Sequence, residues 1–133
     1  MANETLTLTL DTIGTNISVT INDTSQTPGY SATVGTYYSS AYTMSGTDRN
    51  GSISGNNPNI SLNAGDTMVF YMNTSGHPFY IKNTQTTGTG GGASGVTNNG
   101  AVTGTITYTP PSAGAFYYIC SIHGGMSGTI TVS

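Results

Sequence analysis

Apolar and polar residues alternate with a period of two along this chain, and this alternation constrains the fold more than any other feature of the sequence. Residues 5–10 read TLTLTL and residues 16–21 read NISVTI. Successive side chains of a β-strand point to opposite faces, so each such segment can bury one face. The same pattern predicts later strands at 30–34, 41–44, 51–53, 59–62, 67–72, 79–82, 102–109, 115–120 and 128–132. No segment has a convincing helical period, and the chain is therefore predicted to be all-β.

Turn-forming residues separate these segments and indicate how the strands are connected. Asn50-Gly51, Asn57-Pro58, Asn99-Gly100 and Pro110-Pro111 are dipeptides that favour turns. Many short strands with this punctuation are typical of an antiparallel sandwich or barrel. The stretch TSQTPG at 24–29 is predicted to join two parts of the chain. Residues 1–40 as a whole are expected to form an N-terminal β arm or extension, ahead of a main domain over residues 41–133.

The longest glycine-rich stretch, residues 84–100, is predicted to be a flexible loop between two strands. Its sequence is TQTTGTGGGASGVTNNG. A phosphate-binding loop would need a lysine followed by Ser or Thr, and a helix that the glycines open. Neither is present, so a nucleotide site is not predicted.

Charge and cysteine content exclude several classes of protein. The chain has five acidic residues and two basic residues, Arg49 and Lys82, so its formal net charge is −3. Two basic residues cannot form the basic patch that a nucleic acid requires. No apolar run approaches the length of a membrane span. The opening MANETLTLTL lacks the basic and apolar regions of a secretory signal, and the sequence assigns no compartment. With one cysteine the chain cannot form an internal disulfide, so the fold depends on its core.

The candidate functional residues are concentrated near the C-terminus. Cys120, His123 and Met126 lie within seven positions, and His77, the second of two histidines, is predicted in a loop between two strands. Taken singly, a cysteine is usually a small core residue, a methionine fills gaps, and a loop histidine is solvated. Taken together, two imidazoles, a thiolate and a thioether form the donor set of a blue copper site. Zinc gains little from a thioether but could occupy the same ligands, and an iron–sulfur cluster would need more cysteines.

Two motifs resemble the cupredoxins, the family of type 1 copper proteins that includes plastocyanin and amicyanin. The closing AGAFYYICSIHGGMSGTITV is similar to the family segment in which a strand delivers Cys and a tight loop carries His and Met. The upstream NISLNAGDTMVFYMNTSGHPFYI is similar to the segment that precedes the first His ligand. The resemblance implies a cupredoxin-like Greek-key β-sandwich over about residues 41–133, binding one copper ion. It also implies His77, Cys120 and His123 as equatorial ligands and Met126 as the axial ligand.

The sequence departs from the family pattern at two positions beside these ligands. Many members place Asn after the first His, where its backbone N–H donates to the cysteine sulfur, whereas Pro78 has no N–H. Plastocyanin has Pro before the second His, whereas this chain has Ile122, whose N–H is available. Hydrogen bonds to the sulfur tune a copper site, so we expect the bonding around Cys120 to differ from that of the family.

Two functions are compatible with this sequence. The first is one-electron transfer, with a redox partner protein in transient contact near His123. The second is a structural or adhesive module, similar in composition to phage virion-associated proteins, with structural or scavenged copper and an oligomer formed through the N-terminal arm. An enzyme is not predicted, because a copper enzyme of this kind needs more histidines and no Ser/His/Asp triad can be built without a copper ligand.

Overall fold

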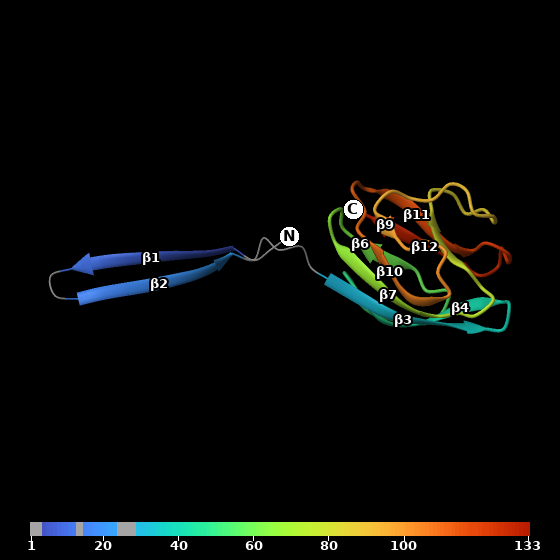
Figure 1. The fold of residues 1–133 in the computed structure, drawn as a ribbon, viewed down its shortest axis with the longest axis horizontal. Coiled ribbons are helices and arrows are strands. Elements are labelled where there is room, and N and C mark those ends of the chain that lie inside the picture. The colour runs from blue at the N-terminus through green and yellow to red at the C-terminus, as the bar shows by residue number, and fades with distance from the viewer. Residues whose placement is uncertain (1–3, 13–14, 24–28) are drawn as a thin grey trace.

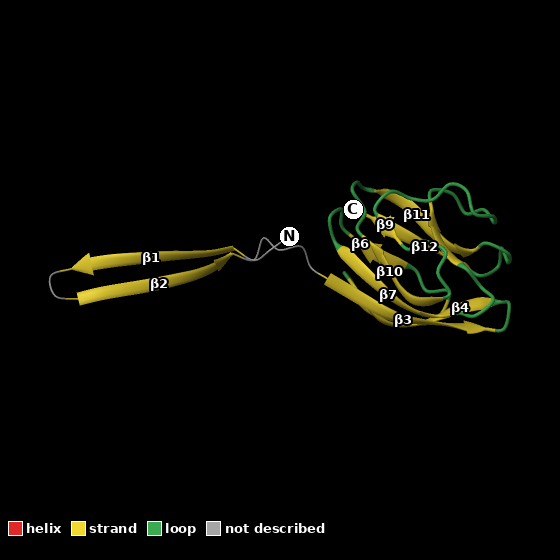
Figure 2. Ribbon diagram, viewed as in Figure 1, coloured by secondary structure: helices red, strands yellow, loops and turns green. Residues whose placement is uncertain are grey.

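The structure, a computed structural model, describes residues 4–12, 15–23 and 29–133. These residues form strands and loops, and none of them forms a helix long and apolar enough to cross a membrane (Figure 2). The strands are β1 Glu4–Thr12, β2 Thr15–Asp23, β3 Gly29–Tyr37, β4 Ala41–Asp48, β5 Gly51–Asn56, β6 Ile60–Leu62, β7 Thr67–Asn73, β8 Phe79–Lys82, β9 Val96–Thr97, β10 Thr103–Tyr108, β11 Gly114–Cys120 and β12 Ser127–Val132.

Ten of the strands form two sheets that pack face to face (Figure 1). The larger sheet has six strands in the order β5-β4-β3-β7-β10-β9, and the smaller has four in the order β6-β12-β11-β8. Most neighbours are antiparallel, but β3 pairs with β7 and β6 pairs with β12 in parallel. The chain changes sheet five times, at the β5–β6, β6–β7, β7–β8, β8–β9 and β10–β11 connections. The predicted all-β sandwich is therefore confirmed.

The strands that precede residue 41 belong to two different sheets. β1 and β2 form an antiparallel hairpin in a sheet of their own. β3, however, pairs with both β4 and β7 inside the larger sheet. The larger sheet thus includes Gly29–Tyr37, which follow the predicted joint at 24–29 and precede the predicted main domain at 41–133. The parallel pairing of β3 with β7 joins segments that are distant in sequence, so no local pattern indicates it. Residues 24–28 of the predicted joint lie outside the described residues.

Alternating side chains from both sheets fill the core between them. In β7, Met68, Phe70 and Met72 point inward while their neighbours face outward, as the period of two predicts. A cluster of aromatic rings occupies the centre of this core, and Phe79 stacks on Tyr118 with ring centroids 5.3 Å apart. Phe79 begins β8 and Tyr118 lies near the end of β11, so this stack fixes the strands that carry the candidate ligands.

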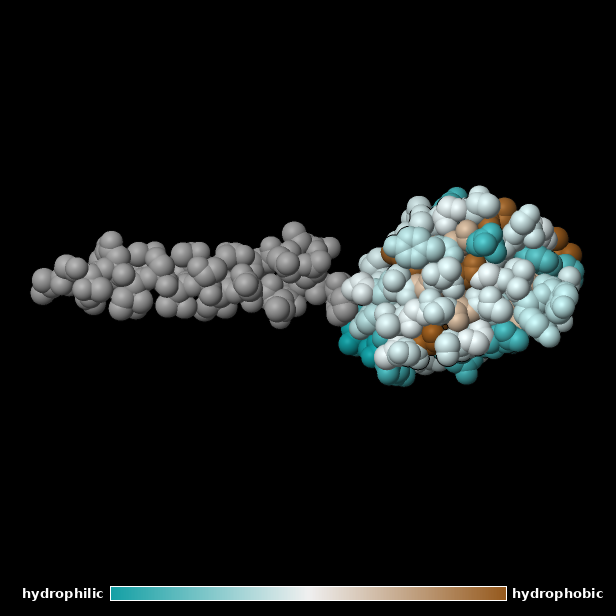
Figure 3. All heavy atoms as spheres, turned by 90° about the horizontal axis from the view of Figure 1, so that it is seen from below, coloured by the Kyte–Doolittle hydropathy of each residue, from teal (hydrophilic) through white to brown (hydrophobic). Residues whose placement is uncertain are grey.

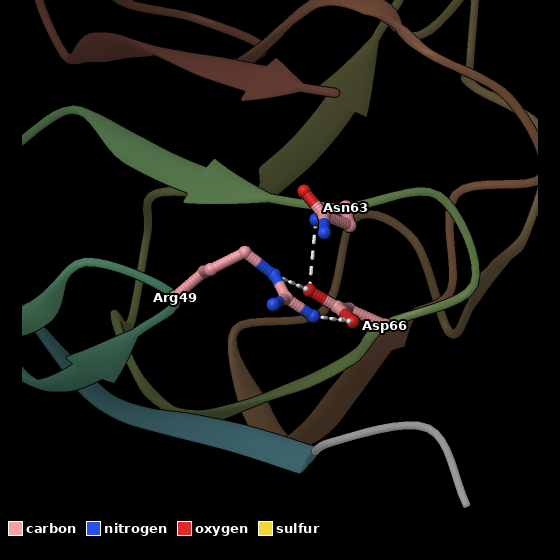
Figure 4. A network of polar contacts seen from close by, with 3 residues as sticks. All are labelled: Arg49, Asn63 and Asp66. Atoms are coloured by element: carbon pink, nitrogen blue, oxygen red, sulfur yellow. Dashed lines mark hydrogen bonds and ion pairs between the residues drawn. The ribbon is translucent and has the colours of Figure 1, made fainter. Parts of the chain in front are cut away.

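An ion pair between Arg49 and Asp66 lies at one end of the sandwich (Figure 4). Arg49 donates from Nε and one terminal nitrogen to the two carboxylate oxygens of Asp66, at 2.8 and 2.7 Å. The Asp66 carboxylate also accepts the Asn63 backbone N–H at 2.8 Å. Asp48 is buried nearby and accepts the backbone N–H groups of Asn50 and Ser61. All polar atoms of these two carboxylates are therefore engaged within the protein.

Candidate metal centre

His77 is held at the opposite end, in the short connection between β7 and β8. Its backbone N–H donates to the Thr74 carbonyl at 2.8 Å, which closes a turn directly after β7. Thr74 is itself buried and donates its N–H to the Val102 carbonyl at 2.9 Å. β8 begins two residues later, so the loop has little freedom and presents the imidazole at the end of the sandwich.

Cys120, His123 and Met126 come from the loop that joins β11 and β12. The Cys120 N–H donates to the Met126 carbonyl at 2.9 Å, and the Met126 N–H donates to the His123 carbonyl at 3.1 Å. These two bonds fold residues 120–126 into a compact turn. The turn lies beside His77, because β8 and β11 pair with Cys120 opposite Phe79. The Ser121 N–H also donates to the Pro78 carbonyl at 3.2 Å.

Three donor atoms converge where these two loops meet. Nδ1 of His77 lies 3.3 Å from Nδ1 of His123, and the Cys120 sulfur lies 3.9 and 3.7 Å from these two nitrogens. The sulfur is fully buried and both imidazoles are half-buried. The structure thus brings together three of the four residues predicted as ligands, across 43 positions of sequence.

The spacing of these atoms fits one bound metal ion. An ion about 2.0–2.1 Å from two nitrogens and about 2.3 Å from a sulfur, with trigonal to tetrahedral angles, separates its donors by roughly 3.4–3.8 Å. The observed separations run from 3.3 to 3.9 Å. A histidine–histidine hydrogen bond alone would not require the sulfur to be near both rings. The cluster is therefore able to hold a metal ion.

Met126 lies at the end of the same turn and is fully buried. It belongs to the core cluster that also contains Cys120, Phe79 and Tyr118. The turn therefore carries Met126 on the same loop as Cys120 and His123. Its role as axial ligand remains a prediction.

Tyr42, at the start of β4, contacts the backbone of the His77 loop, and no pattern in the sequence indicates this contact. Its hydroxyl lies 2.9 Å from the His77 carbonyl and 3.0 Å from the Pro78 carbonyl, and it can donate to either. Burial is the largest cause that raises the pKa of this hydroxyl, and the neighbouring Cys120 raises it further. Tyr42 therefore stays protonated and acts as a donor. It is 35 residues from His77 in the sequence, so only the fold shows the contact.

Asn57 connects the second loop to the same strand. Its side-chain oxygen accepts the Tyr42 backbone N–H at 2.9 Å, and its amide nitrogen donates to the Gly125 carbonyl at 3.0 Å. Asn57 has a positive φ of 47°, a conformation that asparagine tolerates better than most residues. The sequence marked Asn57-Pro58 only as a turn. The structure shows that this turn also positions residues 121–126, the loop between β11 and β12, which we call the ligand loop.

The comparisons with known proteins give structural similarity only. No protein-family model matches the chain, and no curated protein matches it. Among solved structures, reduced rusticyanin is similar at 21% identity, with 79% of each chain covered and a TM-score of 0.44. Rusticyanin from Thiobacillus ferrooxidans is similar at 20% identity, over 84% of this chain and 80% of that one, with a TM-score of 0.44. A structure described as the copper protein rusticyanin gives 23% identity, the same coverage and a TM-score of 0.42.

Rusticyanin is a cupredoxin, the family that the two sequence motifs resemble. The similarity to rusticyanin is one of fold, and the metal and function of this chain are inferred from its own donor atoms.

Proposed function

We propose that this protein is a type 1 copper protein that transfers single electrons. In this proposal His77, Cys120 and His123 are the equatorial ligands and Met126 is the axial ligand. The observation that carries the proposal is the convergence of two imidazole nitrogens and one buried sulfur on a single point. Thiolate and thioether donors suit Cu(I), while imidazole suits both oxidation states. A copper ion held by this set would exchange one electron between Cu(I) and Cu(II).

The ligand loops are held in place by bonds that do not involve a metal. The Ser121 N–H bond to Pro78 ties one loop to the other, and Tyr42 and Asn57 tie both loops to β4. A site that is formed before the metal enters needs little rearrangement when the charge of the metal changes. The backbone bonds around the ligands therefore support a redox role.

The surface around His123 supports a short-lived contact with a redox partner. His123 is half-buried, and the adjacent Ile122 is 62% exposed. The sandwich carries two acidic and two basic residues, so its formal charge is zero, and the arm carries the other three acids, Glu4, Asp11 and Asp23. Figure 3 shows pale, weakly polar residues over most of the visible face of the sandwich. We infer that docking depends on shape and apolar contact near Ile122 more than on charge.

The visible spectrum of the copper-loaded protein tests this function. Addition of Cu(II) to metal-free protein should produce an intense thiolate-to-copper charge-transfer band. Cys120→Ser should abolish the band, because the hydroxyl is a poor donor to copper. Cys120 is the only cysteine, so no other thiolate can produce the signal. A wild-type protein that binds Cu(II) without this band would rule out the type 1 site.

The arm supports a second candidate function, a module that assembles through residues 1–28. The hairpin register places Leu6 opposite Ile21, Leu8 opposite Val19 and Leu10 opposite Ile17, so apolar positions pair with apolar positions. An isolated two-stranded hairpin is marginally stable in water, and an apolar hairpin gains stability when another chain covers it. Sedimentation should then show an assembly that is lost when residues 1–28 are deleted. A monomer at all concentrations would rule out this second function.

A further inference from the structure

Lys82 is buried at the end of β8, and its charge has no carboxylate partner among the described residues. The side chain is 1% exposed. Its ammonium nitrogen lies 2.7 Å from the Thr86 carbonyl, and 3.2 Å from the carbonyls of Thr87 and Gly88. An ammonium group has three N–H donors, and three successive backbone carbonyls match them. Burial of an ammonium group without partners would be costly, and the hydrogen bonds to these carbonyls compensate for that cost.

These carbonyls belong to residues 83–92, which we call the strap. The strap is closed at its base, where the Asn83 N–H donates to the Gly91 carbonyl at 3.0 Å and Lys82 forms a bridge with Gly92. Gly88 has a φ of 90°, which is accessible to glycine, and this bend helps to turn the carbonyls toward Lys82. The predicted free loop is thus folded around one buried cation.

The tip of the strap lies on the ligand loop. The Gly88 N–H donates to the Ser121 carbonyl at 2.8 Å, directly after Cys120. The Gln85 amide donates to the Ser127 hydroxyl at 2.8 Å, directly after Met126. The Thr87 methyl group is close enough to Gly124 that a Cβ added there would lie 3.6 Å from it. The strap is therefore hydrogen-bonded to the ligand loop at its beginning and end, and it lies close to the middle of the loop.

We propose that Lys82 is a positioning residue for the metal centre. Its ammonium holds the strap in its folded form, and the strap holds residues 121–127 so that Cys120 and His123 stay together without a metal. This inference rests on the proposed function for the identity of the metal, but the positioning itself is a property of the metal-free protein.

Modification of Cys120 by a disulfide reagent such as Ellman's reagent tests the proposal on metal-free, full-length protein. A buried thiol reacts only when the structure opens locally. Lys82→Met keeps an apolar stem of similar length but leaves the three carbonyls without donors, so the modification rate should rise about tenfold or more. Arg49→Met is the matched control, because it removes the other cation of the sandwich at the opposite end. Equal acceleration in both variants would mean general destabilisation and would overturn the proposal.

Hydrogen exchange of the wild-type protein supplies a test that does not depend on how the variants fold. The Gly88 amide should exchange nearly as slowly as the amides of β11, although Gly88 lies in an exposed loop. Exchange at the rate of an unprotected amide would overturn the proposal.

In the copper-loaded protein, Lys82→Met should shift the charge-transfer band and Arg49→Met should not. If the wild type shows no such band, the proposed function fails, while thiol modification and exchange still decide the role of Lys82.

Discussion

The two ends of the sandwich share strands but are stabilised in different ways. β7 begins directly after Asp66 and ends four residues before His77, and β4 runs from Tyr42 near the ligands to Asp48 at the far end. At the far end Arg49 satisfies the buried carboxylate of Asp66 through two hydrogen bonds. At the ligand end, Tyr42, Asn57 and the strap around Lys82 hold the backbone through hydrogen bonds, while three side-chain donor atoms face one point. The carboxylate oxygens of Asp66 already accept hydrogen bonds within the protein, so they are not available to a ligand. The three donor atoms at the ligand end, in contrast, can bind a cation.

The largest expected effect is the stabilisation of the ligand end by copper. A ligand that binds only the folded state stabilises it by about 4 kcal/mol when its free concentration is 1,000 times Kd. We therefore expect Cu(II) to raise the midpoint of thermal unfolding, and Cys120→Ser to remove most of the increase. Calorimetry with and without Cu(II) measures both. An equal increase in the two proteins would place the bound copper elsewhere.

A smaller effect is expected from Tyr42→Phe, which removes one hydroxyl beneath the His77 loop. The loss of a donor to buried carbonyls should lower the free energy of unfolding by about 1 kcal/mol. The reduction potential and the charge-transfer band should also change, because the His77–Pro78 backbone is released. Denaturant unfolding and voltammetry measure these effects.

Tyr118→Phe is the matched control for this variant. Tyr118 is also buried and donates to one carbonyl, that of Pro58, at 2.6 Å. Its loss should lower stability by a similar amount but leave the His77 loop in place. If both variants shift the potential equally, the hydroxyl of Tyr42 has no specific role at the site.

The difference between the ends also explains what could be predicted from the sequence. The strands follow from period-two alternation, and three ligands follow from the spacing of Cys120, His123 and Met126. Tyr42, Lys82 and the parallel pairing of β3 with β7 could not be predicted in this way. Each of them depends on a contact between segments that are distant in sequence or on backbone carbonyls, which leave no residue-specific pattern. Local chemistry therefore predicted the ligands, and the fold was needed to find the groups that position them.

A further, weaker effect is expected at the far end when the pH falls. The hydrogen bonds from Arg49 are the main cause that holds the pKa of Asp66 below its usual value of 3.8. A carboxyl group whose pKa is lower in the folded state stabilises the fold above its unfolded-state pKa and loses this contribution as the pH falls through its folded-state value. Wild-type stability should thus fall below about pH 4. In Arg49→Met the free energy of unfolding should depend less on pH in this range, as denaturant unfolding at several pH values would measure. The difference should be modest, because Arg49 is one-third exposed.

The smallest expected effect is that of salt on electron exchange between two copies of the protein. Apart from the copper centre the sandwich has no formal charge, and its two cations are engaged by Asp66 and by the strap carbonyls. Screening by salt acts on exposed, unbalanced charge, so the contact near Ile122 should be nearly insensitive to it. Because the arm carries three acidic residues, the test uses a full-length variant in which Glu4 is replaced by Gln and both Asp11 and Asp23 by Asn. In this variant the self-exchange rate should change by less than about twofold between low and high salt. A strong salt dependence that persists in this variant would show that charge near the ligand end guides the encounter, against the docking mode proposed here.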